Sequence, residues 1–251
     1  MPIHVPFRLA AACALALVSM LVLSATAVAK GPIADIRVVG ANGKQLAEDS
    51  FGVFGDVSIK TSAKATCFGP GTGGSGKSVS AKGATALGML LRAAQFTASL
   101  KPVLISDHFD FGLALCGIGG STASGKNSWY LKLNHVNPEL GGEMVKVGKG
   151  DEVLWALAGF PYPDELALSA PDRVQTGTPF QVRVFSYDDK GKKSPTAGAT
   201  VSGASGPTDA QGRATVTLAK AATLVARHGK DIPSNREAVC VGGKCPGQSS
   251  R

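Results

Sequence analysis

The sequence is poor in the residues that carry enzyme chemistry. Only 4 histidines occur in 251 residues, and no G-x-S-x-G elbow, H-E-x-x-H pair or calcium-loop pattern is present. His108, His135 and His228 lie in separate segments. Strand alternation places His108 and Asp110 on the same side, which we expect to be a solvated face. The sequence therefore predicts no enzyme, no catalytic or metal-ligating residues and no cofactor, and cofactor-binding residues stay unknown.

Blocks of one charge are also missing. The formal net charge is +8, yet lysine and arginine are spread along the chain without a basic run interleaved with aromatic residues. A binder of nucleic acid or of an anionic surface is the alternative that such a charge suggests. We favour scattered lysines on an exported protein, and we expect no nucleic-acid partner.

The longest apolar run lies at the N-terminus. Arg8 precedes the run from Leu9 to Leu23, and Ala27-Val28-Ala29 forms a small-residue cleavage site, as in a secretory signal peptide. The run is shorter than the roughly 20 residues that span a bilayer, so a signal anchor is the less favoured reading. We predict a signal peptide over residues 1–29, a secreted, extracellular or cell-surface location, and no transmembrane segment after cleavage.

Cysteine is scarce but even in number after the leader. Cys67, Cys116, Cys240 and Cys245 would follow export into an oxidising compartment, where disulfides are the default. Three pairings are possible. Because the two clusters lie in different predicted domains, Cys67 with Cys116 and Cys240 with Cys245 is the natural choice.

One glycine-rich segment matches a nucleotide-binding pattern. Residues Gly71 to Ser78 satisfy G-x-x-x-x-G-K-[ST] at every fixed position. A working phosphate loop opens directly into a helix, whereas here five residues intervene before helical periodicity begins. We therefore expect a flexible loop between elements.

Two stretches show clear periodicity. Leu87, Leu90, Leu91 and Ala94 recur at helical spacing after Thr85, which predicts a helix with an N-cap at that threonine. Between Ser128 and Phe160, alternation predicts two strands that turn Trp129 and Trp155 into one core. The tryptophans could instead form a stacking platform for a ligand.

These stretches carry a resemblance. A Thr-Ala-Leu helix start at Thr85, a Ser-Trp strand ending at Asn134 and a Gly150-Asp-Glu step resemble a bacterial family similar to the C-terminal β-grasp domain of transcobalamin. The resemblance implies one helix on a mixed sheet, and it implies that the hairpin from Asn134 to Val147 faces a ligand. Because His135-Val-Asn-Pro138 replaces the usual Asn-Gly turn, no cobalamin contact is transferred to a residue of this chain.

A second domain is expected after the linker Pro161-Tyr-Pro163. Six short runs separated by glycine, proline and aspartate suggest a sandwich. They are Glu165 to Ser169, Pro179 to Tyr187, Ala199 to Val201, Arg213 to Leu218, Thr223 to Arg227 and Arg236 to Val241. The segments from Ala197 to Val201 and from Thr208 to Arg213 resemble bacterial immunoglobulin-like and carboxypeptidase-regulatory-like modules.

The expected fold class is thus an α+β β-grasp domain (one helix on a mixed sheet) over residues 30–162, followed by an all-β immunoglobulin-like sandwich over residues 163–251. The predicted function is a secreted, non-enzymatic binding or adhesion module for an unknown extracellular protein, cell-wall or small-molecule ligand. The alternative is an extracellular carrier of cobalamin or another small ligand. A purely structural surface-adhesion element is a third hypothesis.

Overall fold

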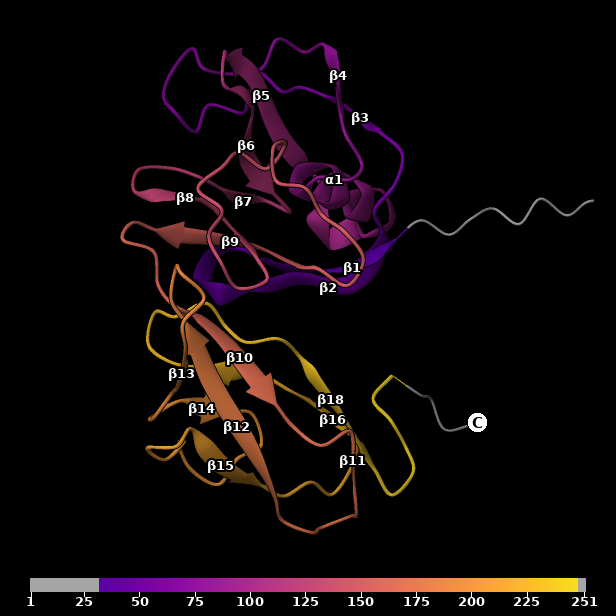
Figure 1. Cartoon of the computed structure of the whole chain (residues 1–251), viewed down its shortest axis with the longest axis vertical. Coiled ribbons are helices and arrows are strands. Elements are labelled where there is room, and N and C mark those ends of the chain that lie inside the picture. The colour runs from indigo at the N-terminus through magenta and orange to yellow at the C-terminus, as the bar shows by residue number, and fades with distance from the viewer. Residues whose placement is uncertain (1–31, 248–251) are drawn as a thin grey trace, which may run out of the picture.

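A computed structural model describes residues 32–247, whose regular secondary structure is mostly β-strand in six small sheets (Figure 1). The predicted signal peptide lies outside these residues. We call residues 32–160 the N-terminal half and residues 164–247 the C-terminal half. No helix in the described part of the chain is long and apolar enough to cross a membrane.

The N-terminal half contains nine strands around one α-helix. They are β1 (Ile33–Val39), β2 (Gln45–Gly52), β3 (Val57–Lys60), β4 (Ser78–Ala81), α1 (Ala86–Phe96), β5 (Val103–Phe109), β6 (Gly112–Ile118), β7 (Ser121–Thr122), β8 (Asn127–Leu133) and β9 (Glu152–Gly159), with short 3-10 turns at η1 (Ala41–Gly43) and η2 (Ala98–Leu100). The strands form three sheets, in the orders β2-β1-β9-β8, β3-β4 and β5-β6-β7. In the first sheet β1 and β9 are parallel, and the other neighbours are antiparallel.

The predicted helix and tryptophan core are confirmed. Helix α1 begins after Thr85, whose hydroxyl accepts a hydrogen bond from the Gly88 amide at 3.1 Å. Trp129 and Trp155 are buried in the same cluster as the helical leucines at positions 87, 90 and 91. Alternation along β8 and β9 explains this, because it turns every second side chain toward the helix.

The C-terminal half is built from shorter strands. They are β10 (Glu165–Ser169), β11 (Arg173–Val174), β12 (Phe180–Tyr187), β13 (Lys193–Pro195), β14 (Thr200–Val201), β15 (Arg213–Val216), β16 (Ala222–Leu224), β17 (Ala226–Arg227) and β18 (Glu237–Val241). One sheet has the order β10-β12-β13, with β15 also paired to β12, and the other sheets are β11-β18-β16 and β14-β17. Their inward side chains form a separate apolar cluster that includes Val182, Val184 and Val216.

The predicted fold class, a β-grasp domain followed by an immunoglobulin-like sandwich, is wrong. The N-terminal strands do not form one mixed sheet, since β5, β6 and β7 pair only among themselves and β8 ends the first sheet. After β6 the chain turns back at once into β7, and the β5–β6 ladder carries two register shifts. In the C-terminal half, several strands are only two or three residues long, so the ladders break into three sheets in place of two facing ones.

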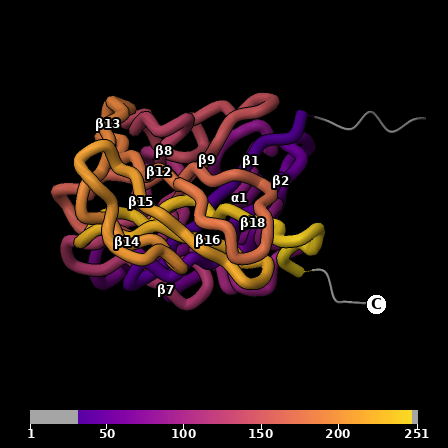
Figure 2. The backbone as a smooth tube through the Cα atoms, turned by 90° about the horizontal axis from the view of Figure 1, so that it is seen from below, coloured from indigo at the N-terminus to yellow at the C-terminus, as the bar shows by residue number. Residues whose placement is uncertain are grey.

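The two halves contact each other through the outer face of the first sheet. Val39, Tyr130, Leu154 and Ala156 turn away from the helix and form a buried cluster with Ile232 of the C-terminal half. Figure 2, viewed from below, shows β14, β15, β16 and β18 in front of the N-terminal half. The sheet β2-β1-β9-β8 is therefore covered on both faces.

Both predicted disulfides are confirmed. Cys67 bonds to Cys116, which joins the loop after β3 to strand β6, and Cys240 bonds to Cys245 at the end of β18. The first crosslink spans 49 residues of sequence and the second spans 5.

Candidate functional site

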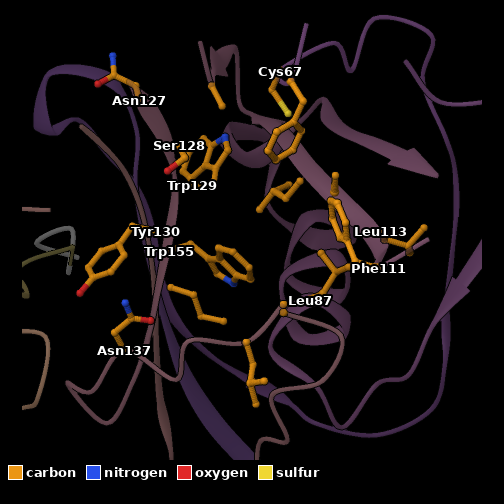
Figure 3. Close-up of a pocket in the computed structure, with 18 of the residues that line it drawn as sticks. Cys67, Leu87, Phe111, Leu113, Asn127, Ser128, Trp129, Tyr130, Asn137 and Trp155 are labelled. Atoms are coloured by element: carbon orange, nitrogen blue, oxygen red, sulfur yellow. The ribbon is translucent and has the colours of Figure 1, made fainter. Parts of the chain in front are cut away.

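A cleft of about 440 Å³ opens between β8 and β6. One wall is formed by β8 and β9, from which Trp129 and Trp155 project toward the side where Leu87, Phe111 and Leu113 lie (Figure 3). Tyr130 also lines the cleft, although it points to the opposite side of the strand in Figure 3. The volume lies within the range of small-ligand sites, and most of the lining is apolar or aromatic.

The rim of the cleft keeps large apolar side chains in solvent. Phe68 is 61% exposed, Phe111 is 63% exposed and Leu140 is 54% exposed. Phe109 packs against both phenylalanines, because its ring centroid lies 5.0 Å from that of Phe68 and 4.7 Å from that of Phe111. Exposed apolar groups gathered at the mouth of a cleft are typical of an interaction site.

The polar groups of the cleft are few. The indole Nε1 of Trp129 is buried and has no hydrogen-bond partner among residues 32–247, whereas Nε1 of Trp155 donates to the Ala86 carbonyl oxygen at 3.4 Å. Asn137 Oδ1 accepts from the Glu139 amide at 3.0 Å. Among residues 32–247, Glu139 is the one charged side chain in the lining, so the cleft carries a negative charge on a chain of net positive charge.

Gly142 packs directly against the indole ring of Trp155. A Cβ atom built on Gly142 would lie 2.7 Å from Cη2 and Cζ2 of Trp155, a distance at which the indole has to move. The absence of a side chain at residue 142 therefore lets the loop lie directly against the ring. Gly141 has no such constraint, since its nearest neighbour would be Met144 Cε at 3.5 Å.

The glycine-rich segment from Gly71 to Ser78 is closed by a carboxylate of the protein itself. Asp107 accepts from the Ser75 amide and from the Ser75 hydroxyl, both at 2.6 Å. The Gly76 amide donates to Thr61 Oγ1 at 3.0 Å, and the Gly74 amide donates to the Ser62 carbonyl oxygen at 2.8 Å. The hydrogen bond from the Ser75 hydroxyl, aided by that from the Ser75 amide, lowers the pKa of Asp107 to about 2. Since these amides already have acceptors, the segment offers no ready cradle for phosphate.

A second cluster, which sequence reasoning missed, consists of five ionisable side chains between the halves. Arg37 of β1 is 2% exposed, Lys132 of β8 is fully buried and Glu165 of β10 is 1% exposed. Arg37 forms an ion pair with Glu165, and Lys132 Nζ lies 3.6 Å from Glu165 Oε2. His135 Nδ1 lies 3.1 Å from Glu165 Oε1, and Glu152 Oε1 lies 3.6 Å from Arg37 Nη2.

Backbone carbonyl groups also accept hydrogen bonds from the two buried cations. Lys132 Nζ donates to the carbonyl oxygens of Tyr187 and Asp188 at 2.9 and 2.8 Å. Arg37 Nη1 donates to those of Leu166 and Pro233 at 3.2 and 2.9 Å. Buried charges are tolerated when they are paired and hydrogen-bonded in this way. All four carbonyl groups belong to the C-terminal half, so these contacts join the two halves.

Electrostatics in this cluster favour the ionised carboxylate. Burial is the largest influence on Glu165 and opposes its charge, but the His135 hydrogen bond and the cations Arg37 and Lys132 outweigh it, so the pKa of Glu165 is lowered. Burial lowers the pKa of Lys132, and Glu165 partly offsets that effect. Burial and the hydrogen bond to Asp189 raise the pKa of Tyr130, which lies next to the cluster.

The ligand atoms of His135, Glu152 and Glu165 lie within 4.8 Å of one another, as in a metal site. Arg37 and Lys132, however, already neutralise the central carboxylate of Glu165. A divalent cation would therefore meet two resident positive charges. We assign the cluster to holding the halves together.

His135 adopts an uncommon backbone conformation. Its φ is 70° after Asn134 at 50°, so both residues are left-handed in the turn that follows β8. This is the geometry that an Asn-Gly turn adopts, and it costs a residue with a Cβ more than it costs glycine. The rings of His135 and Tyr187 are stacked, with their centroids 3.8 Å apart. This contact explains how the turn is stabilised although His135 stands where an Asn-Gly turn has glycine.

The other residues considered from sequence do not come together. His108 and Asp110 are exposed, as predicted. His228 Nδ1 contacts Asp231 Oδ2 at 2.8 Å, far along the chain from His135. His108, His135 and His228 thus have different neighbours.

No family model matches this chain, and neither the curated proteins nor the solved structures include a significant match. The resemblance to the transcobalamin-like and immunoglobulin-like families therefore stays a prediction.

Proposed function

We propose that this chain is a non-enzymatic binding protein of an oxidising, extracytoplasmic compartment, and that its ligand occupies the cleft between β8 and β6. The observation that carries the proposal is the cleft of about 440 Å³, with buried tryptophans inside and exposed Phe68 and Phe111 at its mouth. The two disulfides support such a compartment.

The lining favours binding over turnover. In the described part of the chain its single charged lining residue is Glu139, and its polar side chains are asparagine, serine and tyrosine. Apolar walls with a few polar groups hold a ligand by burial of its surface, which contributes about 25 cal/mol per Å². The ligand should therefore present apolar side groups to the walls.

The test uses the neutral probe N-phenyl-1-naphthylamine and the intrinsic fluorescence of the full chain. The sequence contains 2 tryptophans and both line the cleft, so tryptophan emission reports directly on this site. We expect saturable binding with transfer of tryptophan emission to the probe. In Phe111→Ser we expect the dissociation constant to rise about tenfold through loss of apolar contact area.

Phe160→Ser is the matched control, because Phe160 is also exposed but lies at a different hollow between the halves. It should leave probe binding unchanged. Failure of the probe to bind, or equal loss in both variants, would contradict the assignment of the site. Equilibrium dialysis with cobalamin tests the alternative carrier function, which retention of cobalamin by the wild type but not by Phe111→Ser would favour.

A further inference from the structure

The cleft lies along the edge of β8, not over one face of the sheet. Trp129 and Leu131 belong to the apolar cluster around the helix. Tyr130 and Ser128 alternate to the other side of the strand (Figure 3), yet all four residues line the same cleft. Successive side chains of a strand point to opposite faces, so a hollow that contacts both sets must run beside the backbone.

Hydrogen bonds fix which backbone groups face that edge. Asn127 exchanges bonds with Ser124 at 3.0 and 3.1 Å, and Leu133 exchanges bonds with Val136 at 2.8 and 3.0 Å. Both pairs lie on the side of β8 away from β9. Because these directions alternate along an antiparallel strand, the N–H and C=O groups of Trp129 and Leu131 face the cleft. No partner for them is present in residues 32–247.

The opposite wall is also a strand edge. The Leu113 amide of β6 donates to Glu143 Oε2 at 2.5 Å, away from β5. The Ile105 carbonyl group accepts from Ser62 on the far side of β5, so the Ile105–Leu115 pair is not hydrogen-bonded and Leu115 also faces the cleft. Buried backbone groups without partners are costly, and those of Trp129 and Leu131 line the hollow on the β8 side.

We propose that the cleft binds an extended peptide segment, which adds as a strand to the edge of β8. This proposal rests on the proposed function and names its ligand class. Strand addition supplies main-chain partners at alternate residues, which matches the spacing of Trp129 and Leu131. The apolar walls take alternate side chains of the peptide. Glu139 lines the cleft and Glu143 borders it, so charge complementarity favours a basic residue at one end of the segment.

The experiment uses the full chain and two short synthetic peptides of alternating valine and threonine, blocked at both ends, with lysine at the first or the last position. Amide hydrogen exchange and calorimetry are measured together. We expect one of the two peptides to bind and to slow exchange of the Trp129 and Leu131 amides at least tenfold. A version with alternate peptide amides methylated keeps the side chains but cannot complete the ladder, so it should not bind.

The preference for a basic residue is tested by Glu139→Lys. This change should lower the affinity for the lysine peptide about tenfold, and it should allow binding of a peptide that has glutamate in place of that lysine. Asp56→Lys, at an exposed position outside the cleft lining, is the control and should change neither. Binding without protection of Trp129 and Leu131, or equal binding of the methylated peptide, overturns strand addition. If the naphthylamine probe binds and both peptides fail, the peptide class is wrong and the cleft function stands. If the probe also fails, both proposals fall.

Discussion

Arg37 and Glu165 form a buried ion pair across 128 residues of sequence, and it joins β1 of the N-terminal half to β10 of the C-terminal half. The pair lies where the outer face of the first sheet meets the second half. The carbonyl oxygens of Leu166 and Pro233 accept hydrogen bonds from Arg37, and His135 Nδ1 lies 3.1 Å from Glu165 Oε1. Exposing either member of the pair to water would therefore break further contacts as well.

Glu165→Gln should destabilise the protein strongly, because it removes the buried carboxylate that neutralises Arg37 and Lys132. Removal of one partner from a buried pair costs about 3–5 kcal/mol. Urea denaturation measures the change in the free energy of unfolding. Glu152→Gln is the control, since Glu152 is 35% exposed and its ion pair should contribute less than about 1 kcal/mol. Equal effects of the two changes would contradict the central role of Glu165.

Acid should weaken the fold through the same carboxylate. The pKa of Glu165 is lowered from its ordinary value of 4.5, so the unfolded chain binds a proton before the folded protein does. Its stabilising contribution is present above pH 4.5 and is lost as the pH falls through the folded pKa. Glu48, whose pKa burial raises, acts with the opposite sign. We expect the urea concentration at the midpoint of unfolding to decrease as the pH is lowered from about 5 to about 3. A flat midpoint over that range would show that Glu165 does not carry acid stability.

Gly142→Ala should disturb the tryptophan wall, because the added Cβ meets Trp155 at 2.7 Å. Overpacking of this kind costs about 1–3 kcal/mol. Tryptophan emission should shift in wavelength, and probe affinity should fall. The neighbouring Gly141→Ala has space for its methyl group and should behave as wild type. If the two variants are indistinguishable, the loop does not lie against the indole.

The two disulfides should differ in their effect on the cleft. Replacing Cys67 and Cys116 by serine opens the longer crosslink, which stabilises by about 4 kcal/mol in the chain-entropy account, and it loosens the loop that carries Phe68. Replacing Cys240 and Cys245 should cost about 2 kcal/mol. Thermal denaturation and naphthylamine binding are measured on both. Only replacement of Cys67 and Cys116 should reduce probe binding. Reduced binding in both variants would mean that the effect comes from general destabilisation of the fold.

Asp107 should titrate at about pH 2 while the Ser75 hydroxyl donates to it, and Ser75→Ala should raise its pKa toward 3.8. NMR titration of the carboxyl carbon measures this shift. Ser62→Ala, in the same loop but without a bond to Asp107, is the control. Addition of Mg-ATP should leave the Ser75 and Gly76 amide signals of the wild type unchanged. Specific shifts there would revive the phosphate-loop interpretation.

Alternation and helical spacing were sufficient to predict the core. Trp129, Trp155 and Leu87 follow from periodicity because the face they share is apolar throughout. The cysteine pairs follow from their separation along the chain. Most of the C-terminal strands were also placed correctly, since turn residues separate them.

Strand pairing and the charge cluster could not be predicted in this way. Alternation says which face a side chain takes, but not which strand lies beside it, so the gap between β6 and β8 left no signal. Lys132 alternates with Trp129 and Leu131 as an outward residue would, and nothing local indicates that Glu165, 33 positions later, covers it. The sequence match from Gly71 to Ser78 likewise did not indicate that Asp107 of β5 accepts hydrogen bonds from Ser75.

The covering of the first sheet on both faces limits how the chain can be dissected. A truncated protein ending at Phe160 would expose Tyr130 and Leu154 to solvent. It would also leave Arg37 and Lys132 without their partners on an apolar surface. Such a fragment should precipitate, and the intact chain should melt in one cooperative step.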